Sequence, residues 1–306
     1  MMHQKPAMTA GDDTLPRVQT GRTDISGLDI FYRRAGEGGE AVILIHGAGS
    51  AHSGFTWKHT LPALGARFRA VAPDLPGYGM SAGPDWEAPG MGSPLAYHID
   101  FIPRLLDRLG LERAHLVGNS MGGGLSLGVA LAYPERVRSL SLIDSYGLGT
   151  QMPGGIFTYA LSRLPYFNDL LRLVLIRSRF LVKLGLRQLL AHPARISEEL
   201  VDDAWESVRM KLDHPAWLAF QRHEFTPRGL RTCYLDRLKE IRCPVLIVHG
   251  ADDRLLPAGH SREAHHLLPH SRLELIPGCG HLPSREHPEI LNTLLIEFLE
   301  NTVPEV

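Results

Sequence analysis

The chain has 306 residues, with 32 Lys and Arg against 33 Asp and Glu, which gives a net charge of −1. Hydrophobic residues make up 44% and charged residues 21%, a globular composition that excludes a disordered, collagen-like or coiled-coil chain. The balanced charge also argues against a dedicated nucleic-acid-binding protein, which needs a basic excess to neutralise phosphates.

The N-terminal segment, residues 1–16, is polar and lacks the apolar core of a secretory signal. No run of about 18 apolar residues that could span a bilayer follows it. Three cysteines without a C-x-x-C pair favour neither a disulfide framework nor a structural zinc site. We therefore expect a polar N-terminal tail, no membrane partner and a cytoplasmic location.

Continuous apolar runs predict a parallel sheet. Loose alternation over residues 18–34 predicts a hairpin with a turn near Gly27. Runs without polar alternation suit strands buried on both faces. We predict such strands over 41–47, 69–75, 114–120, 137–145 and 244–250, and a shorter one over 272–278.

Helix-like segments alternate with these strands, over 99–110, 121–134 and 285–300. This alternation predicts βαβ units and an α/β fold with a mostly parallel, eight-stranded sheet flanked by helices. The strand pattern is interrupted over 147–235, where we predict amphipathic helices at 161–164, 169–190, 197–210 and 215–224. We expect a core of residues 17–146 and 236–306, with residues 147–235 inserted after the sixth strand as a helical cap.

The strongest local signal is the G-x-S-x-G sequence over residues 118–122. An apolar run precedes it and a run of small residues follows, which is the strand-to-helix context that a nucleophile elbow requires. The glycines are expected because so tight a turn leaves no room for side chains beside the serine. Ser120 is therefore the candidate nucleophile, at a helix N-terminus whose dipole favours developing negative charge.

A serine hydroxyl needs a base to remove its proton, and His281 is the candidate among 16 histidines. It lies in a Gly- and Pro-rich loop after the last predicted strand, and the chain order serine, acid, histidine fits this type of fold. Three aspartates are candidate acids: Asp252 and Asp253 after the strand 244–250, and Asp144 after the sixth strand. No cofactor or metal is expected.

Acyl transfer also needs N–H donors for the oxyanion. One donor is assigned to Met121, the residue after the nucleophile. The sequence HGAGS, residues 46–50, follows the strand 41–47, and its glycines allow the backbone to approach a substrate closely. We assign the second donor to the N–H of Ala48, with Gly47 and Gly49 as neighbours.

Five segments, HGAGS, DLPGYGMS, GNSMGG, GADDRLLP and GCGHLP, occur in this order. Together they resemble the α/β-hydrolase fold superfamily from about residue 20 to the end, as a capped serine hydrolase. The resemblance implies a triad of Ser120, Asp253 and His281, because the family's acid lies three residues after the strand-end glycine, here Gly250. It also implies that Asp74 is structural.

Within the superfamily the chain resembles both carboxylesterases and the carbon–carbon bond hydrolases of meta-cleavage pathways, which cleave ring-fission dienoic acids. GNSMGG, SLIDSYGLG and ISEELVDDAWESV are similar to the latter. Those enzymes typically carry an Arg before the cap aromatic, where this chain has Ala204 before Trp205. They usually carry Trp after the triad histidine, where this chain has Leu282. The family's Arg binds a substrate carboxylate, and its absence argues for another substrate.

The expected function is therefore a hydrolase of carboxylic esters that acts through an acyl-enzyme on a small-molecule ester or related acyl substrate. The carbon–carbon hydrolase is the alternative, followed by an acyltransferase and a non-catalytic ligand receptor. We expect a monomer or homodimer that binds no nucleic acid.

The cap is expected to set specificity by closing over the site. Besides the two loop glycines, the candidate pocket residues are Trp57, Asn119, Phe157, Tyr159, Trp205, Trp217 and Leu282. Residues 163–187 carry six Arg and Lys against a single acidic residue, Asp169, and we interpret these cations as a solvated helix face.

Overall fold

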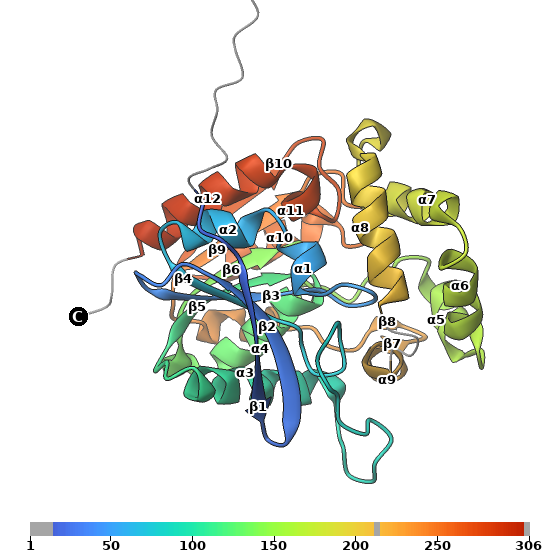
Figure 1. The fold of residues 1–306 in the computed structure, drawn as a ribbon, viewed down its shortest axis with the longest axis horizontal. Coiled ribbons are helices and arrows are strands. Elements are labelled where there is room, and N and C mark those ends of the chain that lie inside the picture. The colour runs from blue at the N-terminus through green and yellow to red at the C-terminus, as the bar shows by residue number, and fades with distance from the viewer. Residues whose placement is uncertain (1–14, 211–214, 303–306) are drawn as a thin grey trace, which may run out of the picture.

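The computed structural model describes residues 15–210 and 215–302, arranged around one large sheet (Figure 1). The strand order is β1-β2-β4-β3-β5-β6-β9-β10. Strand β2 is antiparallel to both of its neighbours, and the other pairings are parallel. This confirms the predicted mostly parallel, eight-stranded sheet. The strands are β1 (Gln19–Ile25), β2 (Leu28–Ala35), β3 (Ala41–Ile45), β4 (Arg69–Pro73), β5 (Ala114–Asn119), β6 (Val137–Ile143), β9 (Val245–Gly250) and β10 (Ser271–Ile276).

The predicted tail, residues 1–16, lies outside the described residues except for Leu15 and Pro16. The first two strands form the predicted hairpin. Its two-residue turn is Ser26-Gly27, and both residues have positive φ, 55° and 82°. Such a turn matches the twist of the strands that it joins.

Helices cover both faces of the sheet. Along β3, Ile43 and Ile45 pack in one apolar cluster, with α3 (Pro94–Arg108), α4 (Met121–Ala132) and α10 (Ala258–Leu267). Val42 and Leu44 pack in the other, with α2 (Thr60–Gly65) and α12 (Pro288–Glu300). Side chains alternate between the faces of a strand, so a strand buried on both faces reads as a continuous apolar run.

The cap lies between β6 and β9 in the chain, as predicted. Its helices are α5 (Gly155–Arg163), α6 (Phe167–Leu175), α7 (Arg179–Leu189), α8 (Glu198–Arg209) and α9 (Pro215–Glu224). The single helix predicted over 169–190 is divided into α6 and α7, because Ser178 caps a new helix by accepting from the N–H of Leu181. A short hairpin of β7 (Phe225–Thr226) and β8 (Gly229–Leu230) was not predicted.

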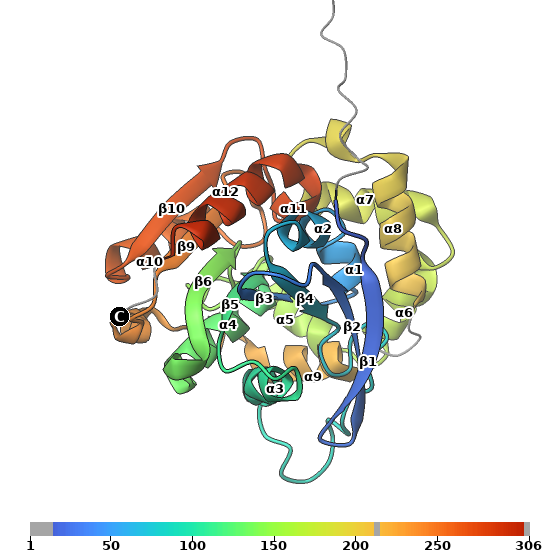
Figure 2. The same cartoon turned by 60° about the vertical axis from the view of Figure 1, so that its left-hand side comes forward.

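The cap is joined to the core by apolar packing at one side of the sheet, where Figure 2 shows α6, α7 and α8 together. Leu186 of α7 and Leu200 of α8 pack in one cluster with two core residues, Phe55 in α1 (Ser53–Thr56) and Leu282 just before α11 (Pro283–Glu286). No helix within residues 15–210 and 215–302 is long and apolar enough to cross a membrane.

Candidate active site

Ser120 lies at the tight turn between β5 and α4, with φ at 54°. A Cβ at Gly118 would lie 2.2 Å from the carbonyl oxygen of Gly122, and one at Gly122 would lie 2.1 Å from the carbonyl oxygen of Ile45. Real Cβ atoms do not approach so closely, so both positions require glycine. The turn holds the serine in a strained conformation that exposes its hydroxyl at the end of the sheet.

The structure brings Ser120, His281 and Asp253 into one line. His281 Nε2 lies 3.0 Å from Ser120 Oγ, and its Nδ1 lies 2.7 Å from Asp253 Oδ2. The other carboxylate oxygen of Asp253 accepts from the N–H groups of Leu255, at 2.7 Å, and Leu256, at 3.2 Å. The carboxylate is therefore fixed on one side by backbone and directs its free oxygen at the imidazole.

The charge state of Asp253 follows from these contacts. Burial alone would raise the pKa of its carboxyl group, but hydrogen bonds from His249 and His281 outweigh this effect and hold the pKa below its usual range. Asp253 is thus ionised and can stabilise an imidazolium at His281.

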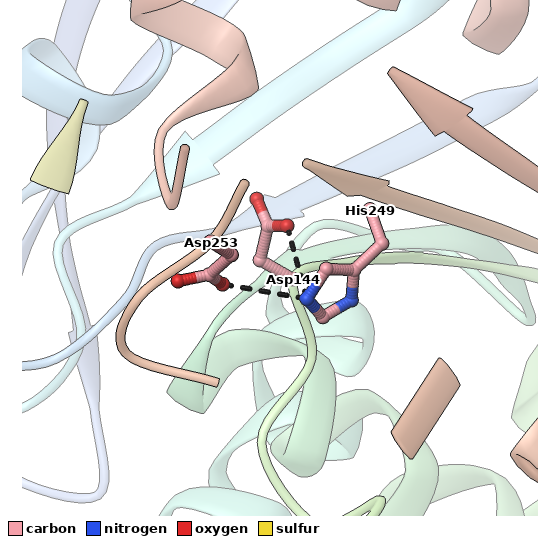
Figure 3. Close-up of side chains that lie close together, drawn as sticks. All are labelled: Asp144, His249 and Asp253. Carbon is pink, nitrogen blue, oxygen red and sulfur yellow. Dashed lines mark ion pairs between the residues drawn. The ribbon is translucent and has the colours of Figure 1, made fainter. Parts of the chain in front are cut away.

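A second acid, Asp144, lies beside the first (Figure 3). The Nε2 atom of His249 is 3.3 Å from Asp253 Oδ2 and 3.6 Å from Asp144 Oδ1. Burial raises the pKa of Asp144 to about 6, and its Oδ2 has no hydrogen-bond partner. Because Asp253, and not Asp144, contacts His281, the geometry favours Asp253 as the triad acid.

Ligand-type atoms of Asp144, His249 and Asp253 lie within 4.8 Å of one another, the only such group among the described residues. The imidazole between the two acids is engaged by protein groups. Its Nε2–H donates to the carbonyl oxygen of Leu256 at 2.9 Å, and its Nδ1 lies 2.7 Å from Ser261 Oγ. His249 is therefore held by Leu256 and Ser261 in a position between the two acids, beside the triad.

Ser120 and His281 open into a cavity of about 390 Å³. The two assigned oxyanion donors, Ala48 and Met121, also line it. The N–H groups of both residues have no acceptor among the described residues. An anionic oxygen beside Ser120 would supply the missing acceptor.

Of the predicted pocket residues, Trp217 lines this cavity. Gly47 lies under the nucleophile, where an added Cβ would be 3.3 Å from Ser120 Cβ. Gly49 lines a neighbouring cavity of about 130 Å³ whose wall also includes Trp217. Asn119 is buried and donates to the carbonyl oxygen of Ile143, so it supports the turn from below.

The other five predicted pocket residues lie elsewhere. Trp57 is fully buried in the core beside α2, and Leu282 is buried between core and cap. Phe157 is 67% exposed at the outer surface of α5, and Tyr159 lies under the guanidinium of Arg163. Trp205 donates to the carbonyl oxygen of Ile176 within the cap. None of the five lines the cavity at Ser120, because residue type and proximity in sequence do not reveal which side chains point toward it.

Sequence reasoning missed most of the cavity wall. Three further aromatic residues line it with Trp217: Tyr146, Phe220 and Phe225. Leu255 and Leu256, directly after the acid, line it too. Their place next to Asp253 in the sequence was an available signal, whereas the two phenylalanines reach the site only through the fold of α9 and the β7–β8 hairpin.

The tyrosine in this wall is anchored by a buried acid. The hydroxyl of Tyr146 donates to Glu224, which is fully buried and also accepts from the N–H of Thr232. Burial, with the nearby negative charge of Glu224, raises the pKa of Tyr146 well above its usual range. The phenol is therefore neutral, and its hydroxyl is held by Glu224 while the residue lines the cavity.

Known proteins show the same organisation. The chain is 31% identical over 287 residues to a 2-hydroxy-6-oxo-6-phenylhexa-2,4-dienoate hydrolase of Comamonas testosteroni, covering 90% of this chain and 93% of the relative. It is 33% identical over 280 residues to the dihydrolipoyllysine-residue acetyltransferase component of the acetoin cleaving system of Pseudomonas putida. The match covers 88% of this chain and 66% of that relative.

A solved structure, the 2-hydroxy-6-oxo-6-phenylhexa-2,4-dienoate hydrolase of Rhodococcus sp. strain RHA1, superimposes with a TM-score of 0.78 at 25% identity, covering 93% of this chain and 99% of that one. The model of the alpha/beta hydrolase fold family matches residues 40–288, which include the turn at Ser120 and the loops of Asp253 and His281. The chain therefore belongs to the alpha/beta hydrolase fold family and is a hydrolase.

Proposed function

We propose that this hydrolase cleaves carboxylic esters with an uncharged, apolar acyl group, through an acyl-enzyme. The observation that carries the proposal is the cavity wall. Ser120 and His281 face a surface built from apolar and aromatic side chains with Gln221 and Thr158, and no Lys, Arg, Asp or Glu lines it. Such a cavity fits an apolar acyl chain or ring better than a substrate with a free carboxylate.

The proposed mechanism starts with the hydrogen bond between Ser120 Oγ and His281 Nε2. The hydroxyl oxygen attacks the ester carbonyl carbon, and its proton passes to His281, whose imidazolium is stabilised by Asp253. The oxyanion accepts from the N–H groups of Met121 and Ala48. His281 returns the proton to the leaving alkoxide, and the acyl group remains on Ser120 Oγ. Water, deprotonated by His281, then attacks the acyl carbon, and His281 returns the proton to Ser120 Oγ as the bond between the acyl carbon and Oγ breaks and the acid leaves.

The cap supplies the acyl pocket in this proposal. Residues 147–235 are assigned to the cap, and residues 17–146 and 236–306 to the catalytic core. The stacked rings of Trp217 and Phe220, with centroids 5.7 Å apart, come from the cap, whereas Leu255 and Leu256 come from the core. A cytoplasmic location and a monomeric or homodimeric state remain predictions.

The second candidate is a carbon–carbon bond hydrolase, which uses the same kind of triad. It is favoured by the identity to relatives named as dienoate hydrolases. Two positions at which the sequence departs from the carbon–carbon bond hydrolases argue against this candidate. Ala204 and Leu282 are both buried in the apolar cluster between cap and core, so neither offers a cation for a substrate carboxylate.

Parallel kinetics distinguish the two candidates. The purified chain is assayed with a p-nitrophenyl butyrate series and with 2-hydroxy-6-oxo-6-phenylhexa-2,4-dienoate, with Ser120→Ala as the blank for both. We expect kcat/KM for the best ester to exceed that for the dienoate by at least about 100-fold, roughly 3 kcal/mol of transition-state discrimination. A higher value for the dienoate would establish the second candidate instead. Product transfer to an added alcohol is followed in the same assays, because it would reveal an acyltransferase.

A further inference from the structure

The outer surface of the cap carries an unusual concentration of exposed apolar side chains. Among the described residues, every large apolar side chain that is more than half exposed lies between residues 156 and 180. We name these six residues the outer cap face: Ile156, Phe157, Leu164, Tyr166, Leu170 and Phe180. Tyr166 is 81% exposed and Phe180 is 70% exposed.

The outer cap face lies on three consecutive helices, α5, α6 and α7, each of which contacts the next, and on the connection between α5 and α6. Figure 1 shows them on the side of α8 that faces away from the core. Neither α5 nor α6 buries a single residue, although α6 reads Phe-Asn-Asp-Leu-Leu-Arg-Leu-Val-Leu. Apolar surface of this extent on one side of a chain marks an interaction surface.

The charge of the same helices indicates what the surface binds. Arg179 and Lys183 are neutralised by Glu198 and Asp202 of α8. Three further arginines, Arg163, Arg177 and Arg187, lie on α5, between α6 and α7, and on α7, where the sequence has one acidic residue, Asp169. Arg163 and Arg177 donate to backbone carbonyl groups and have no carboxylate partner among the described residues. Exposed apolar side chains mixed with unneutralised arginines match an anionic lipid surface.

One of the helices that carry the outer cap face, α6, also borders a cavity near the catalytic serine. Leu171 and Arg172 of α6 line the cavity of about 130 Å³ that reaches Gly49 in the oxyanion loop. Trp217 forms a wall of that cavity and a wall of the catalytic cavity. A lipid surface in contact with α6 would therefore lie beside a cavity that shares Trp217 with the catalytic cavity.

We propose that the outer cap face docks the enzyme on anionic phospholipid bilayers, with its apolar side chains in the interfacial layer and its arginines on the headgroups. This binding needs no spanning segment, so it revises the expectation of no membrane partner, which was based on the lack of a long apolar run. The binding is independent of the reaction performed at Ser120.

The test uses the full-length Ser120→Ala chain and flotation with vesicles of phosphatidylcholine, with or without 30% phosphatidylglycerol. Because the serine is absent, binding is measured whatever the substrate is. We expect flotation with the anionic vesicles, weakened by salt. Replacing both Arg177 and Arg187 by Gln should lower the partition coefficient about 25-fold, because each cation near the surface contributes roughly a factor of five.

The apolar contribution is tested with Leu170→Asp and Phe180→Asp, which should abolish flotation. Leu267→Asp and Ile290→Asp are matched controls, since these exposed residues lie on α10 and α12 of the core. Thermal unfolding checks that each variant is folded. Flotation unaffected by the cap variants, or absent in the parent chain, would overturn the proposal. A dimer in light scattering that Leu170→Asp converts to monomer, without flotation of the parent, would assign the face to a second copy of the chain and equally overturn it.

Discussion

The backbone N–H of His281 donates to the carbonyl oxygen of Leu189, at 2.6 Å. Leu189 is the last residue of α7, so the histidine of the triad is held directly by the cap. Glu286 reinforces this link, because its carboxylate accepts from the N–H groups of Gly280, Ala191 and His192. The position of the base therefore depends on where the cap lies.

Glu286→Gln should lower kcat more than it changes KM. The amide would direct an NH₂ group at N–H donors that now share a carboxylate, and the side chain is buried, so solvent does not compensate for the lost hydrogen bonds. We expect kcat to fall about tenfold to 100-fold through displacement of His281. Steady-state kinetics check this, with Glu289→Gln, an exposed position on α12, as the control. An unchanged kcat would show that the link to α7 suffices alone.

Ser120→Ala and His281→Ala should each remove nearly all hydrolysis. Because nucleophile and base act as a unit, the double variant should be no slower than either single variant. The variants should still hydrolyse the substrate about 10³-fold faster than the uncatalysed reaction in water, because the oxyanion donors and substrate binding remain. Burst kinetics with an activated ester measure all three chains. If the losses in rate of the two single variants multiplied in the double variant, Ser120 and His281 would not act in the same step.

Asp253→Asn should be far more damaging than Asp144→Asn. Loss of the carboxylate at 253 removes the contact with His281 Nδ1 and favours the wrong tautomer, which costs about 10⁴ in kcat in a comparable triad. Asp144 does not contact His281, and its Oδ1 accepts from the N–H of Gly250. We expect a change below about tenfold for Asp144→Asn. If kcat fell more in Asp144→Asn than in Asp253→Asn, the triad acid would be Asp144 instead of Asp253.

Asp144 should make the protein less stable as the pH rises from about 4 to about 6. Burial raises the pKa of its carboxyl group to about 6 in the folded chain, so the unfolded chain ionises first. Across this window the unfolded state binds fewer protons, and the free energy of unfolding falls by up to about 3 kcal/mol.

Chemical denaturation of the wild type and Asp144→Asn at pH 4, 5, 6 and 8 measures this effect. The stability of the variant relative to the wild type should grow with pH up to about 6 and then level off. A constant difference across the series would show that Asp144 ionises no later in the folded chain than in the unfolded one.

Much of the fold was predictable because its signals are local. Each strand buried on both faces is a continuous apolar run, and the turn at Ser120 needs glycines that the sequence shows directly. The meeting of Ser120, Asp253 and His281 follows from topology, since loops after parallel strands gather at one edge of a sheet.

The cap was less predictable because its helices pack on one another through few buried residues. Two short helices replace the predicted helix 169–190, and the strands β7 and β8 are only two residues long. Which aromatic ring faces the cavity depends on helix rotation, so Phe220 could not be told from Phe157 by residue type. The exposure of Phe180 likewise depends on tertiary packing, because no other element among the described residues covers this side chain. The sequence around residue 180 does not indicate this.

Leu255 and Leu256 have two tasks at once. Their backbone N–H groups hold the carboxylate of Asp253, and both residues form part of the wall of the cavity at Ser120. A substitution at either residue that changes the shape of this wall can also displace the backbone N–H groups that orient Asp253. If the substrate is an ester, substitutions at Trp217 and Phe220 of the cap can change the fit of the acyl group without affecting the acid. Substitutions at Leu255 and Leu256 of the core cannot. In directed evolution, variants with altered acyl preference and undiminished turnover should accumulate in α9 and spare the loop after β9.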